Sequence, residues 1–223
     1  MKFIELNHRI TNGMVTFPGM PGVVIDAYMT REESGRDYGE KANSLLDRIQ
    51  MVNISGTYLD SPNHRFENGY TVADIPLEKC ANLRYQVVDL PEGKKCFDKE
   101  DLQGVGIKGG AVLLHTDHDQ KFGTDAYGEN VPYLSVEGAQ YLIDKGVVFV
   151  GIDTPLIDDN DRMMELGNPV HDIILGAGGI VCEDMTNLKA AIPYQENGRL
   201  YAAPARVEMA SFTTRVFVQT NED

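Results

Sequence analysis

The sequence predicts a single α/β domain with a mixed sheet, spanning residues 1–223. Its length suits one sizeable domain, and no repeat or linker divides it. The 22 glycines and ten prolines indicate many turns, which is typical of a strand-rich or mixed fold. The expected strands outnumber the expected helices, and the helices fall mainly in the second half of the chain.

The first half of the chain is expected to consist of short strands and turns. Residues 2–10 and 45–54 alternate between apolar and polar side chains, and residues 22–29 also have a strand pattern. Residues 13–22 between them are rich in turn formers. Residues 32–40 are polar and contain glycine, which predicts a loop or a mobile flap. Short buried strands are expected at residues 85–90 and 111–114.

The second half adds two helices. Ser135 can cap a helix whose apolar face includes Ala139 and whose exit is allowed by Gly146. A buried strand follows at residues 147–152. A second helix is expected from Asn168, as the cap, and Pro169, as the first helical residue, to about residue 175. The remaining expected strands are residues 180–183, 206–209 and 215–219.

Composition excludes several classes of partner. The formal charge is −14 and no Lys/Arg cluster is present, so a nucleic acid backbone would be repelled. No apolar run approaches the roughly 20 residues of a membrane span, and the first residues lack the pattern of a signal peptide. The cysteines are three and widely spaced, which favours reduced thiols and a cytoplasmic location. They are Cys80, Cys96 and Cys182.

The first candidate site lies in residues 56–66, where Asp60 and His64 flank Pro62. Pro62 fixes its own φ and biases the preceding residue to an extended form, so the loop is stiff. The two side chains are then held in a fixed relation, as a metal site or a general base requires. The alternative is a surface turn in which Asp60 bonds its own backbone.

His171 and Glu183 form the second candidate site. His171 is expected near the start of a short helix, and Glu183 at the end of the strand that follows. Helix, glycine-rich turn and strand fold back on one another, so the two side chains could converge. Imidazole nitrogen and carboxylate oxygen suit zinc or manganese. The alternative is a solvent-facing histidine and a glutamate at an exposed strand end.

The other histidines give weaker signals. His115 and His118 lie in the polar segment HTDHD, which is interpreted as a solvated loop, with substrate contact as the alternative. His8 falls in the first expected strand and is interpreted as structural. The sequence has no G-x-S-x-G elbow, Walker loop, H-E-x-x-H motif or G-x-G-x-x-G after a strand, so the chemistry depends on the two candidate sites.

Several motifs, taken in order, resemble the cyclase-like metal-dependent hydrolases, a family that includes bacterial kynurenine formamidase and isatin hydrolase. The resemblance covers nearly the whole chain. Its parts are residues 12–14, 17–19, 56–64, 132–135, 150–155, 171–175, 183 and 186–188. It implies a swivelling β/β/α arrangement, with a mixed sheet or partly closed barrel and flanking helices. It also implies a homodimer or homotetramer, in which an N-terminal segment often crosses between subunits.

The resemblance also assigns site residues. The family's first motif is His-x-Gly-Thr-His-x-Asp-x-Pro-x-His, and this chain has Ile54 and Tyr58 at the two early histidines, which help to bind one metal. His64 matches the catalytic histidine. The residues that match the ligands of a second metal are Asp60, His171 and Glu183. The implied cofactor is therefore one divalent ion per chain, zinc or manganese, held by three ligands with open positions.

The expected activity is hydrolysis of a small amide, formamide or lactone, with metal-bound water as the nucleophile. His64 would take up and return the proton, with Asp60 as its neighbour. The expected substrate contacts are Tyr58, Phe17 and His118. Two alternatives stay open at this point. One is a non-catalytic or altered family member that binds a small ligand, and the other is a dehydratase or cyclase that uses the same residues.

Overall fold

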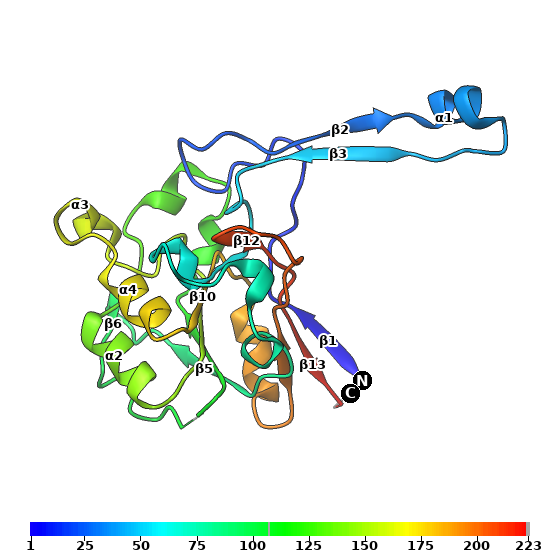
Figure 1. The fold of residues 1–223 in the computed structure, drawn as a ribbon. Helices are drawn as coiled ribbons and strands as arrows, with labels where there is room; N and C mark the ends of the chain where they lie inside the picture. The colour runs from blue at the N-terminus through cyan, green and yellow to red at the C-terminus, as the bar shows by residue number, and fades with distance from the viewer. Residues whose placement is uncertain (107, 222–223) are drawn as a thin grey trace.

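The computed structural model describes residues 1–106 and 108–221, which are built around a six-stranded mixed sheet (Figure 1). Its order is β12-β4-β10-β9-β7-β5. Strands β5, β7, β9 and β10 are parallel, and β4 is antiparallel to both of its neighbours. The strands are β4 (Tyr58–Asp60), β5 (Tyr85–Asp89), β7 (Ala111–His115), β9 (Phe149–Ile152), β10 (Ile180–Glu183) and β12 (Ser211–Thr213).

Smaller sheets surround this one. An antiparallel sheet of order β1-β13-β11 holds the two ends of the chain side by side (Figure 1). A second sheet is the antiparallel pair β2 and β3, and a third is the parallel pair β6 and β8. Their bounds are β1 (Lys2–Glu5), β2 (Val24–Met29), β3 (Leu46–Gln50), β6 (Cys96–Phe97), β8 (Tyr133–Leu134), β11 (Arg199–Tyr201) and β13 (Phe217–Thr220).

The α-helices are short. They are α1 (Arg31–Tyr38), α2 (Val136–Asp144), α3 (Met163–Leu166) and α4 (Pro169–Gly176). Single turns and short 3-10 helices cover Pro62–His64, Val72–Asp74, Leu77–Lys79, His118–Lys121, Asp125–Gly128, Asn160–Arg162 and Leu188–Tyr194. In the described part of the chain, none of the helices combines the length and apolarity needed to cross a bilayer.

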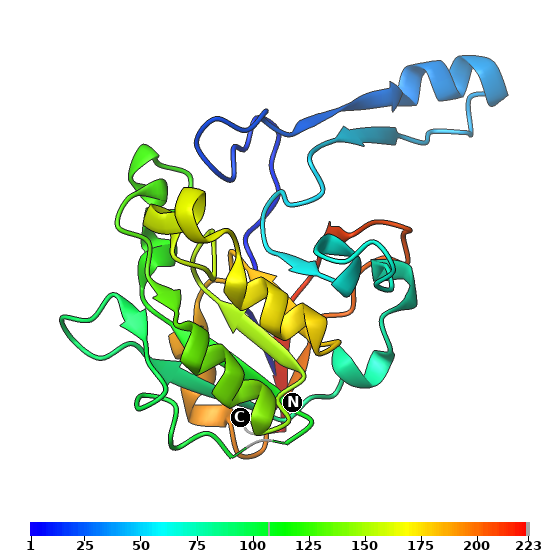
Figure 2. The ribbon, with the colours of Figure 1, turned by 60° about the vertical axis from the view of Figure 1, so that its left-hand side comes forward.

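Both faces of the central sheet are buried. Along β7, Ala111 and Leu113 belong to one hydrophobic cluster, and Val112 and Leu114 to another, as the two-residue period of a strand requires. The first cluster includes residues of β1, β13 and β11, and the second includes residues of α2 and α4, which lie side by side over the sheet (Figure 2). The β/β/α layering is thus confirmed, and the six-stranded sheet ends at β12 and β5 without closing.

An arm formed by β2, α1 and β3 projects from the rest of the molecule (Figures 1 and 2). Helix α1 corrects the prediction of a loop at residues 32–40. The Thr30 side chain accepts a hydrogen bond from the Glu33 backbone N–H, and the Glu33 carboxylate accepts one from the Thr30 backbone N–H. This capping box supplies partners for free N–H groups of the first turn, so it outweighs the polar, glycine-containing composition.

Other elements divide into confirmed and corrected predictions. Ser135 caps α2 as expected, and its side chain accepts a hydrogen bond from the Gly138 N–H. Asn168 makes no side-chain capping bond, although α4 does begin with Pro169. The strand expected at residues 206–209 is wrong, because this segment forms local backbone bonds such as Met209 N–H to the carbonyl of residue 207. Pairing with β4 begins only at β12.

Candidate active site

Strand β4 and the turn after it place Asp60 and His64 together. β4 is an inner strand, and Asp60 at its end is fully buried. The 3-10 turn Pro62–His64 then folds back, and His64 Nδ1 lies 3.6 Å from Asp60 Oδ1. The interpretation as a solvent-exposed turn is therefore wrong for Asp60. His64 remains partly open to solvent, with a side-chain exposure of 38%.

Strand β10 brings Glu183 beside Tyr58. The two residues are opposite one another in the antiparallel register of β10 and β4. The Tyr58 hydroxyl donates a hydrogen bond to Glu183 Oε2, and the Ile157 N–H donates to Oε1 at 2.6 Å. Glu183 is buried and satisfied by neutral donors, so the interpretation as an exposed strand end is wrong.

His171 lies in the first turn of α4 and is oriented by Asp158. This carboxylate contacts His171 Nδ1 and accepts hydrogen bonds from the backbone N–H groups of Val170, at 2.7 Å, and His171, at 3.3 Å. It therefore does the capping that the sequence assigned to Asn168. Bonding at Nδ1 turns Nε2 toward the site, where it lies 3.5 Å from both Asp60 Oδ2 and Glu183 Oε1.

The cluster concentrates negative charge away from water. Burial raises the pKa of Glu183 to about 7, an effect that His171 opposes and Asp60 reinforces. Burial alone would lower the pKa of His171, but Glu183, Asp158 and Asp60 together raise it well above its ordinary value. Asp60 Oδ2 is buried and has no hydrogen-bond partner among the described residues. A positive charge at this point would satisfy it.

These donors fit a divalent cation. Single ligand atoms of Asp60, His64 and His171 lie within 4.8 Å of one another. Glu183 faces the same His171 nitrogen, so the structure brings all four predicted residues together. Mixed nitrogen and oxygen donors suit zinc or manganese. The geometry groups His64 with Asp60 and His171, whereas the sequence assigned the third ligand position to Glu183.

Ser211 is a site residue that the sequence analysis missed. Its hydroxyl donates to Asp60 Oδ1 and lies 3.2 Å from His64 Nδ1. It reaches this place because Ser211 on β12 is opposite Asp60 in the register with β4. Asp158 was missed for a similar reason, since neither residue carries a local motif.

A cavity of about 240 Å³ opens onto this cluster. Phe17, Tyr58 and Ile54 line it, and contact of Phe17 and Tyr58 with a substrate stays a prediction. The full lining is Thr16, Phe17, Met20, Ile54, Tyr58, His64, Pro155, Leu156, Asn160, Met163, Asn168, His171, Glu183 and Asp184.

The remaining histidines are used within the fold. His118 is not among the cavity residues; it is buried, and its Nε2 donates to the Tyr127 carbonyl at 2.8 Å. His115 is buried too, with Nδ1 2.6 Å from Asp89 Oδ1. The interpretation of these two as a solvated loop is therefore wrong. Contact of His118 with a substrate stays a prediction. His8 stacks on Phe122 with ring centroids 3.6 Å apart, consistent with a structural role.

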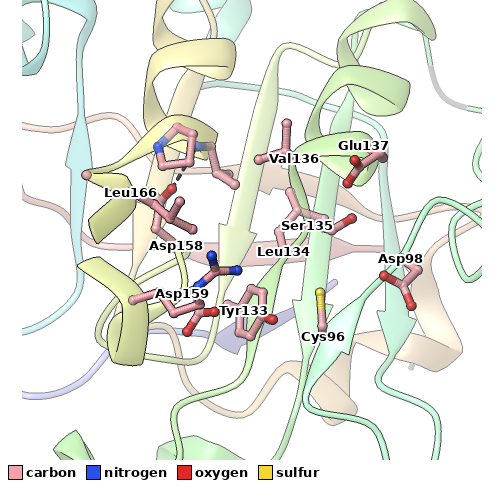
Figure 3. A pocket seen from close by; sticks show the side chains of 14 residues that line it. Cys96, Asp98, Tyr133, Leu134, Ser135, Val136, Glu137, Asp158, Asp159 and Leu166 are labelled. Carbon is pink, nitrogen blue, oxygen red and sulfur yellow. Dashed lines mark hydrogen bonds between the residues drawn. The ribbon is translucent and has the colours of Figure 1, made fainter. Parts of the chain in front are cut away.

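A second cavity, of about 440 Å³, is lined by residues of β6, β8, α2 and the start of α4 (Figure 3). Asp158 is in its wall, and so are Cys96, Tyr133 and Asp159. Burial, aided by Asp98, raises the pKa of Cys96 to about 12, so its thiol stays protonated. A protonated thiol is a poor nucleophile. The predicted site residues His64, His171 and Glu183 line the smaller cavity instead.

Comparison with known proteins identifies the family of this chain. The sequence model described as "Putative cyclase" matches residues 4–159, which is well over half of the chain. The chain belongs to the cyclase family. The matched region contains Asp60 and His64 but ends before His171 and Glu183.

Relatives of this cyclase-family chain include kynurenine formamidases. Those of Bacillus anthracis and Bacillus thuringiensis subsp. konkukian are each 26% identical over 164 residues, which is 72% of either chain. A solved structure titled "potential metal-dependent hydrolase with cyclase activity" is 25% identical, with a TM-score of 0.76, and covers 100% of this chain and 99% of its own. Isatin hydrolase A from Labrenzia aggregata shares the fold at 19% identity, with a TM-score of 0.80 over 99% and 94% of the two chains.

Proposed function

We propose that this cyclase-family protein is a metal-dependent hydrolase of a small amide, formamide or lactone. One observation carries the proposal: the unpartnered oxygen of buried Asp60 lies 3.5 Å from His171 Nε2, Glu183 Oε1 lies at the same distance from that nitrogen, and His64 is in the cavity wall. The names of the relatives, kynurenine formamidase and metal-dependent hydrolase, support the same reaction class.

Asp60, His171 and Glu183 would hold one zinc or manganese ion per chain. The chemistry supplied by a divalent ion here is polarisation of the substrate carbonyl and acidification of water. Ile54 and Tyr58 argue against a second ion. Ile54 offers no ligand atom, and the Tyr58 hydroxyl already donates to Glu183.

His64 acts as the general base and acid, and Ser211 orients it. A serine hydroxyl has one proton, so when Ser211 donates to Asp60 it can only accept at its own oxygen from His64 Nδ1–H. This arrangement fixes the proton on Nδ1 and leaves the Nε2 lone pair free. Burial lowers the pKa of His64 despite the opposing Asp60 carboxylate, so the imidazole is neutral near pH 7 and can take a proton. Phe17 and Tyr58 contact the substrate.

We also propose that each chain forms a single domain, that the protein assembles as a homodimer or homotetramer, and that it is located in the cytoplasm. The projecting arm exposes apolar side chains that a second copy would cover; they include Tyr28, Tyr38, Leu46 and Ile49. Free thiols at all three cysteines favour a reducing compartment. Both hydrophobic clusters share the central sheet, which supports a single domain.

The test combines metal analysis with activity. We expect about one zinc or manganese ion per chain after dialysis without chelator, and loss of that ion in Glu183→Ala. His64→Ala should retain the ion but lose hydrolysis of N-formyl and lactone substrates. Full hydrolysis by both variants would contradict the proposed roles. No metal in the wild type, even after Zn²⁺ or Mn²⁺ is added, would favour a non-catalytic protein that binds a small ligand in this cavity.

A further inference from the structure

The candidate cavity carries acidic groups and, among the described residues, no lysine or arginine. Glu183 and Asp184 both line it, and buried Asp60 contacts the two histidines of its wall. The other polar side chains of the lining are neutral: Thr16, Tyr58, Asn160 and Asn168.

The arginines nearest in sequence to the lining are engaged elsewhere. Arg65 follows His64, but its Nε donates to Asp172 Oδ1 at 2.7 Å. Arg162 precedes a lining residue, but it pairs with Glu165 at 2.8 Å and lines the second cavity instead. Neither guanidinium is therefore placed to receive an anionic group of a substrate.

The rest of the cavity is apolar and small. Six lining side chains are apolar: Phe17, Met20, Ile54, Pro155, Leu156 and Met163. The volume of about 240 Å³ is below the roughly 300–1,000 Å³ of sites for drug-sized ligands. A substrate that fits has about the size of one substituted ring.

We propose that the site selects an uncharged, apolar substrate, such as a small aryl formamide or lactone, and rejects one that carries a carboxylate beside the scissile bond. This inference deepens the proposed function and rests on it. A substrate carboxylate would lose its hydration in an apolar cavity whose lining has no lysine or arginine to receive it, and Asp60 and Glu183 would already balance the charge of a bound divalent ion.

A matched set of substrates tests the selection on the metal-loaded enzyme. Formanilide and 2-formamidobenzoate differ by one carboxylate, and methyl 2-formamidobenzoate supplies the same bulk without the charge. We expect kcat/KM for formanilide to exceed that for 2-formamidobenzoate by about 100-fold or more, with the methyl ester nearer to formanilide. A carboxylate substrate turned over within tenfold of its neutral partners would overturn the inference.

Two variants locate the cause. Met163 lines the cavity, whereas neighbouring Met164 is 97% exposed and does not. Met163→Arg should raise kcat/KM for 2-formamidobenzoate at least tenfold by supplying the missing cation. Met164→Arg adds the same charge outside the cavity and should leave both substrates unchanged. Equal gains in the two variants would show that the overall charge, not the cavity, sets the preference.

Binding separates this inference from the hydrolase proposal. Calorimetry with acetanilide and 2-acetamidobenzoate reports selection without requiring turnover. If none of the formamides is hydrolysed but acetanilide binds at least tenfold more tightly, the charge selection stands and the proposed reaction fails. If 2-acetamidobenzoate binds as tightly or more tightly, the charge selection fails whatever the reaction is.

Discussion

Asp158→Asn tests how the site is held together, because the change keeps the side-chain shape and alters one hydrogen bond. The Asp158 carboxylate accepts from the Val170 N–H with one oxygen and contacts His171 Nδ1 with the other. An asparagine can keep the first bond through its carbonyl oxygen. Its amide NH₂ would then face Nδ1 and donate to it, so the His171 proton moves to Nε2. Nε2 is the nitrogen that faces Asp60 and Glu183, and it would lose the lone pair that binds a metal.

The expected effect is a 10- to 100-fold loss of zinc or manganese affinity, which is about 1.4–2.7 kcal/mol. The hydrogen bond that Asp158 Oδ2 accepts from the His171 N–H at 3.3 Å would be lost, so the free energy of unfolding should also fall by about 1 kcal/mol. Affinity is measured by competition with a chromogenic chelator. The His171 tautomer is measured by ¹⁵N NMR of the metal-free protein at alkaline pH, because the raised pKa of His171 leaves both ring nitrogens protonated at lower pH. Urea unfolding confirms that both proteins are folded during the assays.

Asp172→Asn is the matched control. Asp172 follows His171 in α4, but its side chain is 48% exposed and pairs with Arg65 on the surface. We expect its metal affinity and His171 tautomer to match the wild type. If Asp158→Asn also leaves the affinity within about twofold and the proton on Nδ1, the reasoning from Asp158 to the metal ligand is refuted.

Three further changes probe other parts of the molecule. Ser211→Ala removes the hydroxyl that orients His64, so kcat should fall about 10- to 100-fold with little change in KM; an unchanged kcat would exclude this role. Burial lowers the pKa of His8 to about 4, so stability is lost as pH falls from 6.5 through 4. The loss of unfolding free energy between pH 7 and pH 4 should be on the order of 2 kcal/mol, measured by urea unfolding. His8→Phe should abolish this loss, and an equal loss in the wild type and the variant would contradict the reasoning. Gly69→Ala places a Cβ 2.4 Å from the backbone of the turn that carries His64, so the free energy of unfolding should fall by about 1–3 kcal/mol. The control is Gly35→Ala, whose Cβ meets no atom within 4 Å and should not lower the free energy of unfolding.

Local signals explain which parts of the fold could be predicted. Ser135 and Pro169 act within a few residues of their own positions, and both helix starts were found. Short apolar runs ended by polar or proline residues identified β5, β7, β9 and β10, whereas β4 and β12 were not expected. Thr30 and Glu33 form an equally local signal that composition obscured, so α1 was missed.

The parts of the site that could not be predicted depend on pairing between distant strands and loops. Asp60 and His64 are four residues apart and joined by a stiff turn, so the sequence located them together. Ser211 joins them from 147 residues beyond His64, through the register of β12 with β4. Asp158 reaches His171 from a loop that precedes α3. Hydrogen-bond partners of this kind carry no spacing pattern, because only the tertiary structure brings them together.

Tyr58 stabilises the buried carboxylate of Glu183, although this chain lacks the two early histidines of the family's first motif. A buried glutamate needs either a cation or donors, because an unpaired carboxylate is costly to bury. Burial and the surrounding carboxylates raise the pKa of Tyr58 well above its ordinary value, so its hydroxyl keeps its proton and donates to Glu183. Together with the Ile157 N–H, it satisfies both Glu183 oxygens with neutral groups. Among the carboxylate oxygens of Asp60 and Glu183, only Asp60 Oδ2 has no hydrogen-bond donor within the described residues. A cation would therefore be stabilised most strongly between Asp60 and His171.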